Sequence, residues 1–225
     1  MELNPLARAV STVALAATAF FTLAAFIQLP ADAVLAIHWN INGVADGFAG
    51  KEALLFIPVT TALVGALVWL AVRYDPKREN IARSSDALGL VVVALSLLVA
   101  VTQSAIINSG FGEAARLDGA FDIVIGAFIA ILGYAMTNVR QNYTIGVRLP
   151  WTIESEAAWD ASHRFIGGLW ILIGGATALL GLLGLSAAAI LTLLIGLTLS
   201  IAGTVFVAYR VYRREPRRTR AKRRQ

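Results

Sequence analysis

The chain has 225 residues, of which 58% are hydrophobic, and its mean hydropathy is +0.72. This composition excludes a soluble globular domain and a disordered chain. Because the sequence contains no cysteine, disulfides, thiolate chemistry and iron–sulfur clusters are excluded as well.

About six apolar stretches are long enough to cross the hydrocarbon core of a bilayer, which needs roughly 20 helical residues. These stretches cover more than half of the chain, so we expect no separate soluble domain. The sequence therefore predicts an all-α membrane protein, a bundle of about six transmembrane helices. In chain order, the predicted spans are residues 6–29, 54–72, 87–107, 120–137, 165–183 and 186–209.

The basic residues predict the orientation of these helices. If the chain starts inside and the loops alternate, Lys51 and Arg116 are the only two of the 19 lysines and arginines that lie outside. An excess of basic residues in short cytoplasmic loops sets the orientation of membrane proteins. We therefore predict that both termini are cytoplasmic, and that the sequence pI of about 10.0 reflects this orientation, not nucleic-acid binding.

Two loops are longer and richer in polar residues than the others, and each follows the first helix of a three-helix set. Loop 30–53 lies outside and loop 138–164 lies inside in the predicted topology. We expect an N-terminal half over residues 1–119, a C-terminal half over residues 120–209 and a basic tail over residues 210–225. Because three is an odd number, the second half would be inverted relative to the first, as in many transporters.

Small residues recur every seven positions in the last two predicted helices. Seven residues are close to two helical turns, so each set lies on one helix face, where it permits close approach of another helix. We expect these two helices to pack on each other, with a dimer interface as the alternative. The two sets are Gly167, Gly174 and Gly181, and Ala189, Gly196 and Gly203.

The outer loop is predicted to fold into a small cap. Asn42-Gly43 and Asp46-Gly47 are both turn dipeptides, and residues 38–40 should be extended. The cap is either a recognition surface or a simple closure of the bundle. We predict no metal site, because the two histidines would lie on opposite sides of the membrane. The candidate recognition residues are His38, Trp39, Asn40, Gly43, Asp46 and Lys51.

The inner loop is predicted to end in an amphipathic helix at the inner interface. Thr152 is the predicted N-cap of this helix. Trp159, His163 and Ile166 follow at helical spacing, so the helix should run into the fifth span.

The two arginines of this inner region have three candidate roles. Arg148 and Arg164 would bind lipid phosphates, pair with Glu154 or Glu156, or hold a partner protein.

The inner loop resembles the signature of SdpI-type immunity proteins. The resemblance rests on Asn142, the run Ile145-Gly146-Val147-Arg148-Leu149-Pro150-Trp151-Thr152, and then Trp159 and His163-Arg164. Leu149 replaces the threonine that is commoner in this family. The outer loop resembles a family of unknown function that often precedes that domain. The candidate residues of the inner loop are Asn142, Gly146, Arg148, Pro150, Trp151, Thr152, Trp159, His163 and Arg164.

This resemblance implies a protein of the bacterial inner membrane that protects its host against a secreted, membrane-active peptide toxin. It further implies signalling, in which the toxin-bound protein holds a small DNA-binding repressor at the inner face. The sequence has no HExxH, GxSxG or P-loop motif, so we predict no catalytic residues, no cofactor and no enzyme activity. The alternative function is a small transporter or lipid-handling protein built from inverted halves.

The tail, residues 210–225, carries nine of the 19 basic residues. Clusters of this kind beside a membrane helix bind anionic lipids, with roughly 1 kcal/mol for each basic residue near the surface. Holding a soluble regulator is the alternative. Direct nucleic-acid binding is not expected, because aromatic residues stop at Tyr212. The candidate lipid-binding residues are Arg213, Arg214, Arg217 and Arg218.

Overall fold

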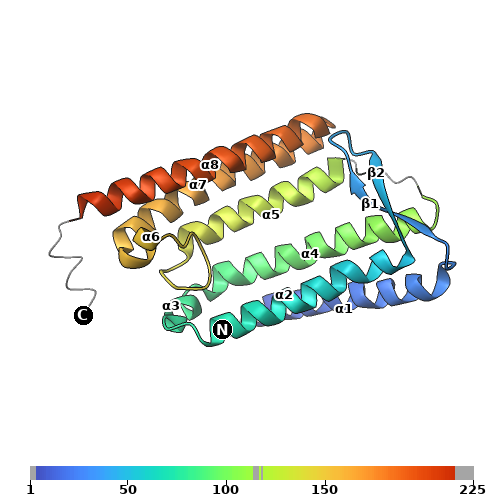
Figure 1. Ribbon diagram of the computed structural model, residues 1–225, viewed down its shortest axis with the longest axis horizontal. Helices are drawn as coiled ribbons and strands as arrows, with labels where there is room; N and C mark the ends of the chain where they lie inside the picture. The colour runs from blue at the N-terminus through green and yellow to red at the C-terminus, as the bar shows by residue number, and fades with distance from the viewer. Residues whose placement is uncertain (1–3, 114–116, 118, 216–225) are drawn as a thin grey trace.

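The computed structural model describes residues 4–113, 117 and 119–215 (Figure 1). Within these residues, six helices are long and apolar enough to cross a membrane, and the chain is a multi-pass membrane protein. The predicted spans are confirmed, with ends that differ by several residues. The long helices are α1 (Pro5–Gln28), α2 (Phe56–Arg73), α4 (Ser85–Gly110), α5 (Gly119–Asn138), α7 (Glu156–Leu182) and α8 (Ser186–Arg214).

Short elements close the two ends of the bundle. At one end, which we call the hairpin end, strands β1 (Val34–Trp39) and β2 (Ala45–Gly50) are followed by a short 3-10 helix, η1 (Lys51–Leu55). At the opposite end, which we call the motif end, lie α3 (Arg78–Ala82) and α6 (Pro150–Glu154). Figure 1 shows that α1 begins and α8 ends at the motif end.

The predicted cap is an antiparallel β-hairpin. β1 pairs with β2 from Val34 opposite Gly50 to Trp39 opposite Ala45. The turn at Gly43 is confirmed, since this residue has a φ of 70°. The predicted second turn at Asp46-Gly47 is wrong: both residues lie in β2, because pairing already begins at Ala45.

Close packing in the C-terminal half is built on glycines of α5 and α7. A Cβ added to Gly174 of α7 would lie 2.4 Å from the carbonyl oxygen of Gly126 in α5, and one added to Gly167 would lie 2.6 Å from the carbonyl oxygen of Gly133. The predicted packing of the last two helices on each other is confirmed, but the glycine stripe of α7 itself faces α5. The overlooked signal was the matching seven-residue repeat of α5, namely Gly119, Gly126 and Gly133.

The small-residue stripe of α8 packs inside the chain on large side chains of α7. A Cβ on Gly196 would meet Ile173 at 2.9 Å, and one on Gly203 would meet the ring of Phe165 at the same distance. The three helices of the C-terminal half thus pack consecutively, α5 on α7 and α7 on α8.

The N-terminal half packs in different pairs, with α1 against α4. The buried Gln103 of α4 donates hydrogen bonds to Thr22 Oγ1 (3.0 Å) and to the Leu54 carbonyl (2.9 Å), which joins α4 to α1 and η1. Helix α2 packs mainly with its chain neighbours, η1 and α3, and residues 62–71 are exposed on every side. Inverted symmetry of the two halves stays a prediction.

We predict that Gly174→Ala destabilises the protein by about 1–3 kcal/mol, because the added methyl group overpacks the α5–α7 contact. The matched control is Gly175→Ala in the same helix, where an added Cβ has nothing within 4 Å. That change should be neutral or slightly stabilising, since alanine favours helix. Unfolding in mixed detergent micelles measures both variants, and equal midpoints would contradict the packing.

Candidate functional site

The loop at the motif end, residues 139–149, is held in shape by a buried asparagine. Asn142 donates to the carbonyl oxygens of Arg140 (2.8 Å) and Ile145 (3.0 Å). Its side-chain oxygen accepts from the backbone N–H groups of Thr144 (2.8 Å) and Ile145 (2.6 Å). Because this amide uses its full hydrogen-bonding capacity, it fixes a tight loop without regular secondary structure.

A stacked tryptophan and histidine lie beneath this loop. The rings of Trp159 and His163 are 3.9 Å apart between centroids and nearly parallel. The indole N–H of Trp159 donates to the Val139 carbonyl (3.0 Å). His163 Nε2 accepts from the backbone N–H of Val147 (3.0 Å), and its Nδ1 donates to the Trp159 carbonyl (2.8 Å). One accepting and one donating nitrogen define a neutral imidazole.

Glycine is required where the loop crosses this pair of rings. Gly146 has a φ of 119°, which side chains rarely adopt. A Cβ there would also lie 2.4 Å from His163 Nε2 and 3.0 Å from the ring of Trp159. The spacing of Gly146, Trp159 and His163 in the sequence is thus explained by one contact.

The predicted role of Thr152 as an N-cap is wrong, because Pro150 begins a separate short helix, α6, and Thr152 lies inside it. From that position, Thr152 Oγ1 accepts from the Leu149 N–H (2.8 Å). The N-cap of α7 is Ser155, whose hydroxyl oxygen accepts from the Ala158 N–H (3.0 Å). Helix α7 then continues into the fifth span, as predicted.

Helix α6 is attached to the end of α8. The ring of Trp151 contacts the ring of Tyr209 edge-on, with 5.4 Å between centroids. The hydroxyl of Tyr212 donates to Glu154 Oε2 (2.6 Å). The C-terminal end of α8, which leads into the basic tail, is thereby joined to the motif.

The loop is also joined to the N-terminal half through Asp75, which is 5% exposed and lies between α2 and α3. Its Oδ2 accepts from the backbone N–H of Tyr143 (2.9 Å) and from the hydroxyl of Thr144 (2.7 Å). Its Oδ1 accepts from the Lys77 N–H (2.7 Å). No local sequence pattern indicated this role of Asp75, because Tyr143 and Thr144 lie 68 and 69 residues further along the chain.

Further polar contacts surround Asp75. Lys77 Nζ donates to Gln141 Oε1, and Asn80 Nδ2 donates to the Gln141 carbonyl (2.8 Å). The amide nitrogen of Gln141 donates to the Thr152 carbonyl (2.7 Å) in α6. Ser84, which precedes α4, accepts from the Arg140 N–H (3.1 Å). The motif loop therefore bridges the two halves of the chain.

The two arginines of the motif remain at the surface. One guanidinium nitrogen of Arg148 donates to the Tyr143 carbonyl (2.9 Å), so Arg148 braces the loop. Arg164 is exposed and has no polar side-chain partner among the described residues. The carboxylate of Glu154 accepts from the hydroxyl of Tyr212, and the pairing of the arginines with Glu154 or Glu156 stays a prediction.

Two of the four candidate lipid-binding residues of the tail lie within the described part of the chain, which ends at residue 215. Arg213 and Arg214 form the last turn of α8. The guanidinium of Arg213 lies 5.9 Å from the ring centroid of Tyr209. Arg217 and Arg218 lie outside the described residues.

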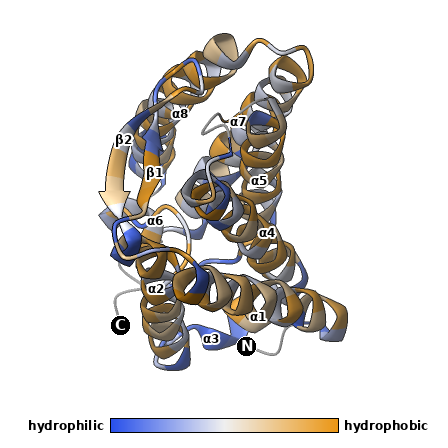
Figure 2. Ribbon diagram, turned by 90° about the vertical axis from the view of Figure 1, so that its right-hand side faces the viewer, coloured by the Kyte–Doolittle hydropathy of each residue, from blue (hydrophilic) through white to orange (hydrophobic). Residues whose placement is uncertain are grey.

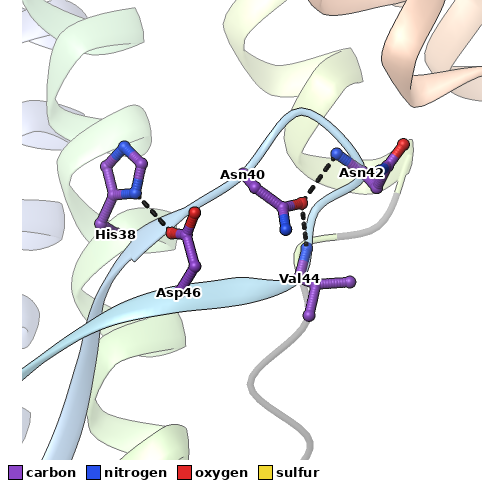
Figure 3. A network of polar contacts seen from close by, with 5 residues as sticks. All are labelled: His38, Asn40, Asn42, Val44 and Asp46. Atoms are coloured by element: carbon purple, nitrogen blue, oxygen red, sulfur yellow. Dashed lines mark hydrogen bonds and ion pairs between the residues drawn. The ribbon is translucent and has the colours of Figure 1, made fainter.

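At the hairpin end, the predicted outer residues separate into two groups. His38 Nδ1 is hydrogen-bonded to Asp46 Oδ1 across the strands, at 2.6 Å, and both side chains are exposed (Figure 3). Asn40 shapes the turn, since its side-chain oxygen accepts from the N–H groups of Asn42 (2.9 Å) and Val44 (3.2 Å). His38 and Asp46 therefore face solvent, at the opposite end of the molecule from His163.

The remaining outer residues attach the hairpin to the bundle. Lys51 Nζ donates to the Leu29 carbonyl at the end of α1 (2.6 Å) and lies 4.9 Å from the ring centroid of Phe26. Trp39 packs against the buried cluster around Leu29 and Leu54. The carbonyl of Gly43 accepts from Leu117 in the loop between α4 and α5 (2.9 Å).

Comparisons with known proteins confirm the resemblance. Residues 138–210 match the SdpI/YfhL protein family, and residues 13–62 match a domain of unknown function, DUF1648. The chain is 24% identical over 144 residues to Immunity protein SdpI of Bacillus subtilis (strain 168), a match that covers 64% of this chain and 67% of that relative. No solved structure matches the chain. The first match contains the motif loop, and the second contains the hairpin.

We predict that Gly146→Ala lowers the unfolding midpoint much more than Gly112→Ala does. Both glycines have positive φ, but an added Cβ has nothing within 4 Å at Gly112 and meets His163 at Gly146. Backbone strain of about 1–3 kcal/mol should be common to both variants. Thermal unfolding in detergent, followed by tryptophan fluorescence, measures the difference, and similar losses would show that the contact with His163 contributes nothing.

We also predict that Asp75→Ala destabilises the protein by about 2–4 kcal/mol, because it removes the acceptor of three partly buried hydrogen bonds. Amide exchange at Tyr143 should accelerate at the same time. Glu79→Ala is the matched control, since Glu79 is an exposed acid in the same link. If both variants unfold alike and leave Tyr143 protected, Asp75 does not hold the loop.

Proposed function

We propose that this chain, which is similar to Immunity protein SdpI, is a receptor-like immunity protein that protects a bacterium against a secreted, membrane-active peptide toxin. One observation carries this proposal. The loop within the SdpI/YfhL match joins both halves of the chain at the motif end, whereas the hairpin within the DUF1648 match is presented at the other end. Such an arrangement suits a protein that senses on one side and responds on the other.

We place the hairpin outside and both termini in the cytoplasm. An even number of spans puts α1's first and α8's last residues at the same end. The motif end also carries most of the basic side chains of the described loops, including Arg73, Arg78 and Arg83. This distribution supports the orientation through the positive-inside rule.

Helix α4 is the proposed connection between the two ends. Near its C-terminal end, the hydroxyl oxygen of Ser109 accepts from the N–H of Ala36 in β1 (2.9 Å). At its N-terminal end, the N-cap residue Ser84 accepts from Arg140 in the motif loop (3.1 Å). A toxin that displaces the hairpin would thereby shift the whole of α4, which is 26 residues long, relative to the motif loop.

We propose that the motif end holds a cytoplasmic partner, such as a small DNA-binding repressor. One guanidinium nitrogen of Arg148 donates a hydrogen bond to the Tyr143 carbonyl, and the rest of this exposed side chain is available to a partner. Arg164 is exposed on α7 and directly follows His163, which accepts from Val147 of the motif loop. Arg213 and Arg214 extend the basic surface, where anionic lipids are the proposed ligands.

The alternative transporter has less support. It would be built from two halves, proposed as residues 1–119 and 120–209, followed by the tail 210–225. These halves pack differently, because α1 contacts α4 in the first, whereas α5 contacts α7 and α7 contacts α8 in the second. A cleft of about 630 Å³ lies at the motif end, lined by residues 73–80 and Glu156, and not midway between the ends. We propose no catalytic role for any residue.

We predict that Arg148→Ala reduces protection roughly tenfold or more while leaving membrane insertion intact, because a charged interface contact is lost. The measurement is survival of a toxin-sensitive bacterium that expresses the protein and is challenged with a membrane-active peptide toxin. Arg140→Ala is the control, because Arg140 is an exposed arginine of the same loop. No protection by correctly inserted wild-type protein would count against immunity, and full protection by the Arg148 variant would count against this residue.

A further inference from the structure

The hairpin has one edge that is occupied and one that is open. The outer edge of β1 is covered by α4, since the N–H of Ala36 donates to Ser109 Oγ. Within the described part of the chain, the backbone of β2 (Ala45–Gly50) makes no hydrogen bond beyond its pairing with β1. Unpaired strand edges of this kind are templates for pairing with another chain.

The strand register identifies the groups at this open edge. Ala36 is paired with Phe48, and its N–H points away from β2 toward Ser109. In an antiparallel ladder, such a pair is not hydrogen-bonded, so the N–H and C=O of Phe48 point away from β1. Gly50, two residues further along β2, repeats this orientation by the same alternation.

The side chains beside the open edge are apolar and accessible. Phe48 is 58% exposed and Val34, which pairs with Gly50, is 62% exposed, whereas Leu35 on the other face is fully buried in the bundle. β2 contains neither lysine nor proline, the residues that commonly protect edges. Figure 2 shows the hairpin at the side of the bundle, with orange segments on both strands.

We propose that the open edge of β2 binds an extended apolar segment of a secreted peptide as a third strand. This proposal rests on the proposed function in taking the toxin as the natural occupant. Another extended backbone supplies donors and acceptors at the spacing of Phe48 and Gly50, which is how strand addition recognises a peptide. The peptide's apolar side chains, at every second position, pack beside Phe48 and Val34.

The first test uses cross-linking, for which the absence of cysteine is an advantage. Full-length Phe48→Cys in lipid nanodiscs is oxidised with blocked synthetic peptides of alternating valine and threonine, each with one cysteine at a different position. Strand addition predicts that efficient cross-links recur with a period of two along the peptide. Uniform cross-linking, no cross-linking, or a disulfide-linked dimer of the protein itself would overturn the proposal, the last by pointing to a second copy.

The second test separates backbone from side chain. Phe48→Pro removes the N–H at the open edge, whereas Phe48→Ala keeps it. The proline variant should bind the same cysteine-free peptide roughly tenfold more weakly than the alanine variant, because one backbone hydrogen bond and its neighbours are lost. Unchanged amide protection in β1 confirms that the hairpin is folded, and equal binding by both variants refutes strand addition.

The experiments distinguish failure of the proposed immunity function from failure of peptide binding at the edge of β2. If the wild type gives no survival advantage but the Phe48→Cys variant cross-links with a period of two, the immunity function is wrong and the open edge binds a peptide of another origin. If the wild type protects and Phe48→Pro protects equally, immunity stands and the edge of β2 is not the toxin site.

Discussion

The tertiary structure at the motif end depends on a buried carboxylate. Irregular backbone at the rim of a membrane must find its hydrogen bonds within the protein, since unsatisfied groups are costly there. The carboxylate of Asp75 accepts from the backbone N–H of Lys77 in its own segment, between α2 and α3. It also accepts from the backbone N–H of Tyr143 and the hydroxyl of Thr144 in the motif loop. The rest of the interface, through Gln141 and Ser84, extends this contact.

Packing differs between the two halves, and the difference suits the proposed sensing role. In the C-terminal half, glycines of α5 and α7 bring two backbones into contact, which restricts sliding and rotation. In the N-terminal half, α1, α4 and η1 meet at the buried Gln103, while α2 stands largely apart. A compact C-terminal platform therefore carries the motif, and the N-terminal half connects it to the hairpin.

Local sequence signals predicted local structure well where a backbone requirement selects the residue. Gly43 marked a turn because positive φ favours glycine, and that turn is present. Asp46-Gly47 has the same local preference, yet strand pairing placed it in β2. Thr152 is a good N-cap residue, but Pro150 opened a separate helix before it. In both errors, the neighbouring segment overrode a local propensity.

The sequence alone determined the number of membrane helices and the residues of the motif, because apolar length and residue spacing are one-dimensional properties. It also contained the seven-residue glycine repeats, although not which pairs of helices would meet. Only the tertiary structure decided that α7 faces α5, that Asp75 binds the motif loop, and that β2 keeps an open edge. These contacts join residues far apart in the chain, and their partners are selected by the fit of whole surfaces, which no local pattern encodes.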